Sequence, residues 1–469
     1  MKNHLFVTLV IMLVILAVLP TTGTTTKQRS NNTDTEDKLN EIQQAIRDTN
    51  AEWTAEYTSI SNATWWQENR DGFGCIDEEI PDEDYETVTY SGTLPDEFDW
   101  RNVNGINYVT PVKNQASCGS CSAFGTLGSL EAVVQIETSE IFDCDLSEAQ
   151  VYFCNGGDCT SGIALSTAVN YIGFVGVADE LCLPYTTSAS CEDKASNWRN
   201  RVIKASTEST TGTENIKNAL LEYGPVVTRF DVYEDFMYYT GGIYELVSGA
   251  KEGGHAVTIV GYNDDPGYWI CKNSWGTGWG ETNPYATTSE KGYFRIKYGE
   301  CNIGANTHYF YNVTGNIQPG KPENLSPYDD ERYVEPDLTF TWSPCEDLDG
   351  DEVYYIVYLG DSMSLQDDDI VANHISSSNV QVTHLEKATI YFWKVVSEDE
   401  HGAQHQSEIH KFYTRSPCQP DVQGPSRGRP HKEYTFKAST TDTDGEEYYW
   451  FFNWGDNSSS GWIGPLWTR

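Results

Sequence analysis

One cysteine near the start of a predicted helix has the setting of a chemical nucleophile. Cys121 lies three residues after Cys118, and the residues that follow it are apolar at the spacing of a buried helix. A thiol in the first turn of a helix meets the partial positive charge of that terminus, which favours the nucleophilic thiolate. The Cys-x-x-Cys pair by itself equally fits a redox pair or half of a zinc site, so its chemistry depends on which other residues join it.

A histidine can serve such a thiol as a base, and histidines are scarce here. Of the nine in the chain, only His255 and His308 lie between residues 92 and 313. His255 follows two glycines and opens an apolar, strand-like run, so its small neighbours leave the ring room to stand at a cleft. The remaining metal-binding alternative is a four-cysteine zinc site that adds Cys154 and Cys159.

An asparagine completes the set. Asn273 is followed by Trp275 and Trp279 in a glycine-rich segment. An amide oxygen next to an imidazole fixes the tautomer and the orientation of the ring, and tryptophans beside it would shield that hydrogen bond from water. Alone, an asparagine in such a loop is usually a turn residue, so its interpretation depends on Cys121 and His255.

Together these three segments resemble the papain family of cysteine proteases over residues 94–312. Cys121 precedes His255 by 134 residues and Asn273 by 152, close to the roughly 130–150 that are typical of the family. The resemblance implies that Cys121 is the nucleophile, that His255 is its base and later its acid, and that Asn273 orients the histidine. It also implies that Gln115 and the backbone N–H of Cys121 form the oxyanion hole.

The sequence departs from the family pattern at three positions near these residues, one of which is Cys271, unusual so close to Asn273. Ser122 stands where the family usually has Trp or Tyr, so we expect different packing behind the helix. Gly254 stands where the family often has Asp or Asn before the histidine, so we expect a shifted pH profile.

The chain contains twelve cysteines, and an exported chain with so many is expected to form disulfides. The resemblance implies three pairs, which are Cys118–Cys159, Cys154–Cys191 and Cys271–Cys301. Cys75 lies in the N-terminal segment, whose removal would leave an even number of cysteines besides the nucleophile.

The resemblance implies an α+β fold. Residues 92–313 are expected to form a papain-like catalytic domain of two lobes, one helical and the other a β-barrel, followed by β-sandwich domains. No insert resembles the occluding loop of the exopeptidase members, which favours an endopeptidase.

The polar and acidic residues 24–91 resemble the short pro-regions of the cathepsin B type, which run backwards through the cleft. Three aromatic residues in this segment, Trp53, Trp65 and Trp66, indicate docking against a surface. We expect a built-in inhibitor that is removed near residue 92. A disordered spacer is the alternative.

Behind the catalytic domain the sequence changes to short alternating runs separated by turns, which is typical of β-sandwiches. Residues 316–415 resemble a fibronectin type III-like module, with the spacing of a tyrosine corner at Tyr391, and residues 419–469 resemble the start of a PKD-like domain. Each contains an acidic turn, at 347–351 and 442–446, that either ligates calcium or is an ordinary acidic β-turn. The β-turn is favoured, because the glycine falls one position earlier than an EF-hand loop requires.

Charge and the N-terminus predict an extracellular protein. Lys plus Arg number 30 against 70 for Asp plus Glu, and the net charge of −40 repels nucleic acid and anionic membranes. Residues 1–23 have the basic start, the apolar run Leu5–Leu19 and the small polar end of a signal peptide. We expect secretion, with an uncleaved anchor at the cell surface as the alternative.

The predicted function is hydrolysis of peptide bonds through an acyl-enzyme. The expected partners are protein or peptide substrates and the protein's own propeptide as inhibitor, and nucleic acid is excluded; the C-terminal modules are candidates to bind a cell surface or a polysaccharide. No cofactor and no metal ion is predicted. Two alternatives stay open: an acyltransferase on the same scaffold, which product analysis would separate, and a catalytically silent adhesion protein, against which the complete set of Cys121, His255 and Asn273 argues.

Overall fold

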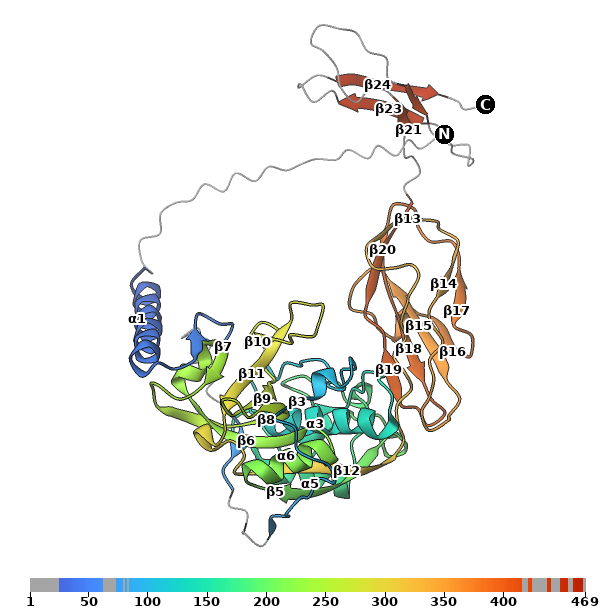
Figure 1. Ribbon diagram of the computed structural model, residues 1–469. Coiled ribbons are helices and arrows are strands. Elements are labelled where there is room, and N and C mark those ends of the chain that lie inside the picture. Colours follow the sequence, from blue (N-terminus) through green and yellow to red (C-terminus); the bar gives the residue numbers. More distant parts are fainter. Residues whose placement is uncertain are drawn as a thin grey trace.

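The structure is a computed structural model that describes residues 25–61, 73–78, 81 and 84–415, together with four short strands between residues 421 and 466 (Figure 1). The predicted signal peptide (1–23), Trp65, Trp66 and the second acidic turn (442–446) lie outside the described residues. Among the helices that the structure describes, none is both long and apolar enough to cross a membrane.

A helix that is buried on every side forms the centre of one lobe. The helices of this lobe are α3 (Cys121–Thr138), α4 (Glu148–Phe153) and α5 (Leu165–Phe174). α3 is buried from Cys121 to Gln135, as expected for a helix enclosed by its own domain. Gly125 and Gly128 of α3 lie against strand β8 (Lys251–Asn263), and a larger side chain at either position would press on that strand. The two elements therefore approach closely, which carries Cys121 to the boundary between the lobes.

The second lobe is built on a ten-stranded, mostly antiparallel sheet with the strand order β1-β7-β11-β9-β8-β6-β12-β5 (Figure 1). Strand β3 is added on β8, and β10 on β11. Besides β8, the bounds are β1 (Trp53–Ala55), β3 (Glu97–Asp99), β5 (Ile203–Thr210), β6 (Val226–Tyr233), β7 (Tyr239–Tyr244), β9 (Tyr268–Lys272), β10 (Glu281–Thr282), β11 (Lys291–Lys297) and β12 (Thr307–Gly315). Aromatic rings fill its core, with Phe236 against Phe230, Trp279 and Phe294, and helix α6 (Thr213–Glu222) packs on β8. This lobe corresponds to the predicted β lobe.

The N-terminal segment meets this two-lobed body at several places, two of which are strand pairings. After helix α1 (Thr25–Thr49), strand β1 pairs with β7 at the edge of the large sheet, and Trp53 is buried against Tyr239 and Tyr244. Farther along, strand β2 (Cys75–Ile76) pairs in parallel with β4 (Ile163–Ala164) of the helical lobe. The burial of Trp53 is the docking that its aromatic side chain predicted.

Two further sheets with a shared apolar core lie beyond residue 315, beside the helical lobe (Figure 1). The larger sheet has the order β13-β20-β18-β15-β16 with β19 on β18, and the smaller one pairs β14 with β17. The bounds are β13 (Glu331–Val334), β14 (Leu338–Thr341), β15 (Tyr354–Gly360), β16 (Ile370–Ile375), β17 (Asn379–Val382), β18 (Ile390–Glu398), β19 (Gln404–Gln406) and β20 (His410–Thr414). Farther on, β21 (Asp421–Gln423) pairs with β22 (Lys437–Ser439), and β23 (Tyr448–Asn453) pairs with β24 (Ser459–Leu466). The sequence therefore predicted β structure correctly in this part of the chain.

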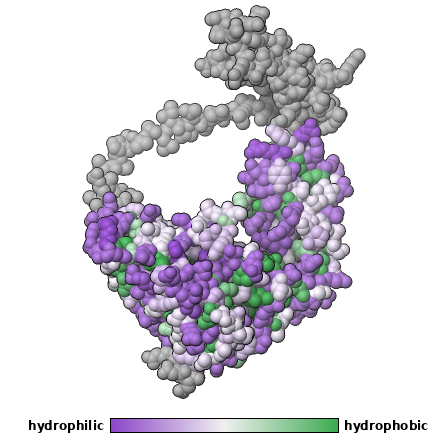
Figure 2. All heavy atoms as spheres, viewed as in Figure 1, coloured by the Kyte–Doolittle hydropathy of each residue, from purple (hydrophilic) through white to green (hydrophobic). Residues whose placement is uncertain are grey.

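The surface agrees with the composition. In Figure 2 hydrophilic residues dominate the visible face of both the body and the β module, and hydrophobic residues form only small groups between them. Polar contacts join the two parts: Lys321 of the module forms an ion pair with Asp143 of the body, and the Asn197 amide of the body donates to the His401 carbonyl of the module (3.2 Å). The module is therefore held against the helical lobe at several points.

Candidate active site

Cys121 is the first residue of α3 and is fully buried. The turn in front of it is held by the Cys118–Cys159 disulfide and by a hydrogen bond from the Gly119 N–H to the Cys159 carbonyl (3.0 Å). The apolar pattern that follows Cys121 is thus a helix, as predicted, and its N-terminus presents the sulfur to the boundary between the lobes.

His255 and Asn273 stand on neighbouring strands opposite this helix. His255 belongs to β8, Asn273 directly follows β9, and the His255 Nε2 lies 2.8 Å from the Asn273 Oδ1. That oxygen also accepts the Ser274 N–H (2.8 Å), so it is an acceptor and Nε2 must carry the proton. Nδ1 is therefore the basic ring nitrogen, and it has no hydrogen-bond partner within the described structure. Trp275 stacks on the imidazole at 4.8 Å between ring centroids.

The predicted oxyanion-hole residue lies in the same place. Gln115 is buried, its Oε1 accepts from the Ser274 hydroxyl (2.6 Å), and its Nε2 donates to the Cys118 carbonyl (2.8 Å). The N–H of Ala256, the residue after His255, points at the Cys121 sulfur. The structure thus brings all four predicted site residues together, from α3, β8 and two loops.

A piece of the N-terminal segment covers this site. The N–H groups of Gly74 and Cys75 point at the Cys121 sulfur, and the Gly74 carbonyl accepts from the Ile163 N–H (3.0 Å). Phe73 packs edge-on against His255, with ring centroids 6.0 Å apart, and contacts Trp275. Under this cover neither Cys121 nor His255 is exposed to solvent.

The cover changes the protonation of both groups. Burial raises the pKa of the Cys121 thiol, and the backbone N–H groups around the sulfur do not overcome it. Burial also lowers the pKa of His255 to about 4, although the hydrogen bond to Asn273 acts in the opposite direction. The covered site therefore holds a neutral thiol beside a neutral imidazole, which is an unreactive pair.

Two of the departures from the family pattern, at Gly254 and Ser122, make room for the covering segment. A side chain at Gly254 would overlap the carbonyl oxygen of Cys75 and the guanidinium of Arg229. The Ser122 hydroxyl donates to the Ile163 carbonyl (2.9 Å) and contacts the Cys75 thiol, where a large ring would not fit. The predicted difference in packing behind the helix is therefore present, and the shifted pH profile remains a prediction.

The structure contains two of the three predicted disulfides, Cys118–Cys159 and Cys154–Cys191. These bonds use Cys154 and Cys159, which rules out the four-cysteine zinc site. The third pair, Cys271–Cys301, is wrong, because both residues carry free thiols. Cys271 is enclosed between β8 and β11, and the Cys301 thiol faces the Glu300 carboxylate from a short turn after β11.

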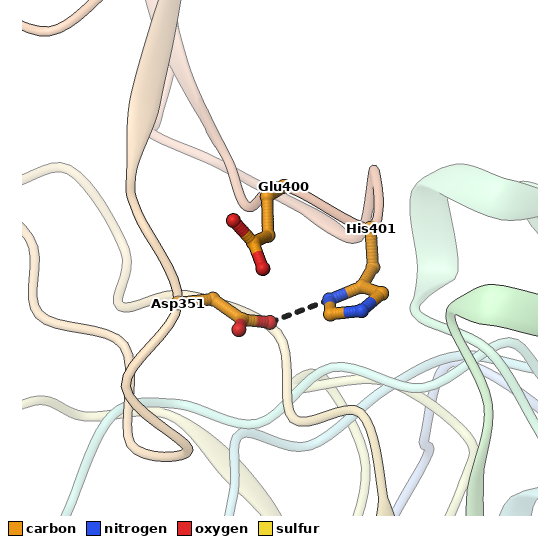
Figure 3. A group of neighbouring side chains, drawn as sticks. All are labelled: Asp351, Glu400 and His401. Carbon is orange, nitrogen blue, oxygen red and sulfur yellow. Dashed lines mark hydrogen bonds and ion pairs between the residues drawn. The ribbon is translucent and has the colours of Figure 1, made fainter.

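The first acidic turn lies at the junction of the body and the β module. The carboxylates of Asp347, Asp349 and Asp351 lie within 4.8 Å of one another, and Asp351 also lies this close to Glu400 and His401. Figure 3 shows the dashed contact between the His401 Nδ1 and Asp351 (2.6 Å), with Glu400 beside it. The backbone N–H groups of Asp349 and Asp351 donate to Asp347, as in an acidic β-turn. These contacts account for the turn itself, and calcium ligation stays a hypothesis.

Two residues at the site were not predicted from the sequence. The Tyr185 hydroxyl donates to the Gln115 carbonyl (2.8 Å) and lies 2.6 Å from the hydroxyl of Ser120, the helix cap. Arg229 lies beside Gly254 in the otherwise largely apolar strand β6. The sequence did offer a signal for Arg229, namely an arginine within a strand that is predicted to be buried. Arginine is almost never fully buried without a partner, so such a position indicates a charged contact.

Comparison with known proteins gives this arrangement a family. Residues 94–311 match the model of the family described as "Papain family cysteine protease". Pro-cathepsin H of Bos taurus is 37% identical over 228 residues, which make up 46% of this chain and 64% of that protein. Cathepsin B-like CP3 of Giardia intestinalis is 34% identical over 240 residues, or 46% of this chain and 74% of that protein.

The fold is shared with a solved structure. The digestive procathepsin L2 proteinase from the Tenebrio molitor larval midgut superposes with a TM-score of 0.52 at 26% identity, over 62% of this chain and 96% of that one. This chain spans slightly less than two thirds of the length of the bovine and mouse pro-cathepsin H relatives, 64% and 66%. The similarity to the solved proenzyme extends beyond the residues of the family match.

Proposed function

The chain belongs to the papain family of cysteine proteases, and we propose that it is a secreted cysteine endopeptidase made as an inactive proenzyme. One observation carries the proposal: the buried Cys121 at the start of α3 lies under residues 73–78, beside a histidine whose Nε2 is held by Asn273. That arrangement supplies a nucleophile, a base with a fixed tautomer and a removable cover. The acyltransferase and adhesion alternatives have no observation of their own in favour.

In the uncovered enzyme the reaction would proceed through an acyl-enzyme. The His255 Nδ1 takes the proton of Cys121, and the thiolate attacks the carbonyl carbon of the scissile bond. The backbone N–H of Cys121 and the Nε2 of Gln115 hold the oxyanion, which requires Gln115 to exchange its present acceptor for the substrate oxygen. His255 then protonates the leaving amine. In the second half of the reaction His255 takes a proton from water, which hydrolyses the thioester, and returns a proton to the Cys121 sulfur.

The domain boundaries that accompany this function are a signal peptide at 1–23, an inhibitory propeptide at 24–91 and a catalytic domain at 92–313. The docking of β1 and of residues 73–78 supports the propeptide. The signal-peptide pattern and the two disulfides support secretion. Endopeptidase action is supported by the lack of a sequence insert that resembles an occluding loop.

We assign a fibronectin type III-like module to residues 316–415 and a partial PKD-like domain to 419–469 as part of the same proposal. The Glu386 N–H donates to the Tyr391 hydroxyl (3.0 Å), a contact of the tyrosine-corner kind that the sequence spacing predicted. The buried Trp393 forms the centre of the module core. A cell surface or a polysaccharide is the proposed ligand class for these modules.

The test is an active-site-directed thiol alkylator applied to residues 24–469 after incubation at acid and at neutral pH. Mass spectrometry should find the label on Cys121 alone, N-terminal sequencing should find cleavage near residue 92, and Cys345→Ser should label as the wild type does. A label on another cysteine, or Cys121 held in a disulfide, would contradict the protease. His255→Ala should abolish turnover, whereas Asn273→Ala should only reduce it; equal, small effects would mean that the roles are misassigned.

A further inference from the structure

The covering segment shows which side of the cleft receives which part of a substrate. Phe73 lies against His255 and Trp275, and the leaving amine must be near His255 to take its proton. The segment then passes the Cys121 sulfur at Gly74 and Cys75. Asp77 and Glu78 therefore lie on the acyl side of the scissile bond, which holds the residues that precede it.

Asp77 fills a cationic position on this acyl side. Its carboxylate forms ion pairs with the guanidinium of Arg229 and with the ammonium of Lys251 (3.5 Å). Both cations also contact Asp231, at 2.9 and 2.7 Å. Without Asp77, these residues have two positive charges against one negative, so removal of the segment leaves one cation unmatched beside the cleft.

The burial and the hydrogen bonding of Arg229 favour the binding of an anion. It is 93% buried, and its Nε makes no hydrogen bond within the described structure. The guanidinium lies where a side chain at Gly254 would be, next to His255, so the glycine opens it to the cleft. A buried guanidinium with an unused donor favours a further carboxylate partner, because Asp231 alone offsets only part of its loss of water.

Glu78 occupies a second carboxylate position next to the first. It accepts the Ser166 N–H (2.9 Å) and the Ser166 hydroxyl in the first turn of α5, and the Asn306 amide (3.1 Å). His308, which is 94% buried and whose Nε2 makes no hydrogen bond to any described residue, also lies close enough to interact with this carboxylate. Two consecutive carboxylates thus meet donors on the same side of the cleft.

We propose that Arg229 and Lys251, flanked by Ser166 and Asn306, form a subsite that binds acidic side chains on the acyl side of the substrate. The proposal rests on the peptidase function above and names its substrate class: peptides with Glu or Asp among the three residues that precede the scissile bond. The direction of the backbone does not matter for this step, because a carboxylate is recognised by charge and by N–H donors. The propeptide holds the subsite with its own Asp77 until it is removed.

The experiment compares peptides that carry Glu, Gln or Lys at each of the three positions. The processed enzyme should cleave the Glu peptide with about fivefold higher kcat/KM than the Gln peptide at one position at least, and the Lys peptide more slowly still. Arg229→Gln should bring the Glu/Gln ratio close to one, Lys251→Gln should lower it, and Arg229→Lys should retain part of it. Each ratio is measured on one preparation, so a loss of overall activity cancels.

Lys297→Gln is the matched control. Lys297 is ion-paired with Glu245 and is 40% exposed, against 41% for Lys251, but it lies on β11 away from the cleft. The ratio should be that of the wild type in this variant. An equal rate for Glu and Gln peptides at every position, or a ratio that Arg229→Gln leaves unchanged, would overturn the subsite.

Binding separates this proposal from the peptidase function. The Cys121→Ser protein, with its propeptide cut by an unrelated protease, is titrated with the same peptides and followed by tryptophan fluorescence. Tighter binding of the Glu peptide that depends on Arg229 supports the subsite even if no peptide is hydrolysed, in which case the peptidase function is what fails. Equal binding of Glu and Gln peptides overturns the subsite even if both are hydrolysed.

Discussion

Two of the places where the N-terminal segment meets the body differ in their chemistry. At β1 the segment extends the large sheet and buries Trp53 against the rings of Tyr239 and Tyr244. Across the cleft, residues 73–78 contact a buried histidine, a cysteine and two cations, and only two residues form strand pairs. The first contact is an apolar anchor, and the second depends on charge and protonation.

This difference implies that the cover can open while the anchor stays bound. The hydrophobic contribution of a buried tryptophan does not change with pH. The stability of the cleft contact does change with pH, because this contact requires a neutral His255 and an ion pair between Asp77 and Arg229. Acid would therefore release residues 73–78 from the cleft ahead of the anchor.

The largest expected effect comes from removing the anchor. Trp53→Ala in a peptide of residues 25–91 should weaken its inhibition of processed enzyme by at least about 100-fold, since large-to-small changes of a buried tryptophan cost about 3–5 kcal/mol. The loss should be the same at pH 5 and pH 7.5. Tyr57→Ala, at a residue that is 55% exposed, is the control and should change inhibition less than twofold. A loss below tenfold for Trp53→Ala would show that the anchor is dispensable.

The second effect is that of acid on the cleft contact, measured in the Cys121→Ser proenzyme so that no thiolate competes for the proton. Burial lowers the pKa of His255 from the ordinary 6.5 to about 4 in the covered site, so a histidine that the segment no longer buries binds the proton more readily. Docking energy is complete above pH 6.5 and is lost as pH falls toward 4. Between pH 7.5 and pH 5 the cleft contact should weaken about 30-fold.

Cleavage of the segment by an added protease reports this opening. The double variant Cys121→Ser/His255→Gln removes the titrating ring and should lose most of the pH dependence. An unchanged pH profile in the double variant would assign acid activation to carboxylates instead of His255.

A smaller effect is expected where the cover approaches the backbone. Gly254→Ala places a methyl group against the Cys75 carbonyl, and overpacking of this kind costs about 1–3 kcal/mol. Inhibition by the 25–91 peptide should weaken about tenfold. Gly278→Ala is the matched control, because its added methyl group would meet only Ser59 at an ordinary contact distance. Equal inhibition of both variants would show that the segment does not approach Gly254 as closely as described.

The smallest effect is that of one exposed carboxylate. Asp77 is 71% exposed, so solvent screens its ion pairs, and Asp77→Asn in the peptide should weaken inhibition only about threefold. The difference should vanish in 1 M salt, whereas the effect of Trp53→Ala should persist. Glu52→Gln, an exposed acid beside the anchor strand, should have no measurable effect at either salt concentration.

Several features of the fold could be predicted because they are local. The apolar spacing after Cys121 predicted the buried helix α3, and alternating runs with turns predicted the strands beyond residue 315. The aromatic Trp53 in a polar stretch predicted docking. Periodicity of this kind depends only on neighbours along the chain, which is why it can be read from one sequence.

Long-range pairing could not be predicted in the same way. Nothing near Cys75 indicates that its strand pairs with Ile163, or that Trp53 pairs with Gly242 at the sheet edge. The Cys271–Cys301 pairing failed for the same reason, because the register of β9 and β11 encloses Cys271 in the core. Register is decided by packing of the whole sheet.

The sequence by itself determined the types and the order of the reacting groups: a cysteine at a helix start, a histidine opening a strand and an asparagine after the next strand. Only the tertiary structure decided that Nδ1 is the basic nitrogen of His255, that residues 73–78 cover the site, and that Arg229 opens toward it through Gly254. A residue's chemistry is intrinsic to its side chain. Its protonation, its cover and its neighbours depend on contacts between segments far apart in the chain, which exist only once the lobes have packed together.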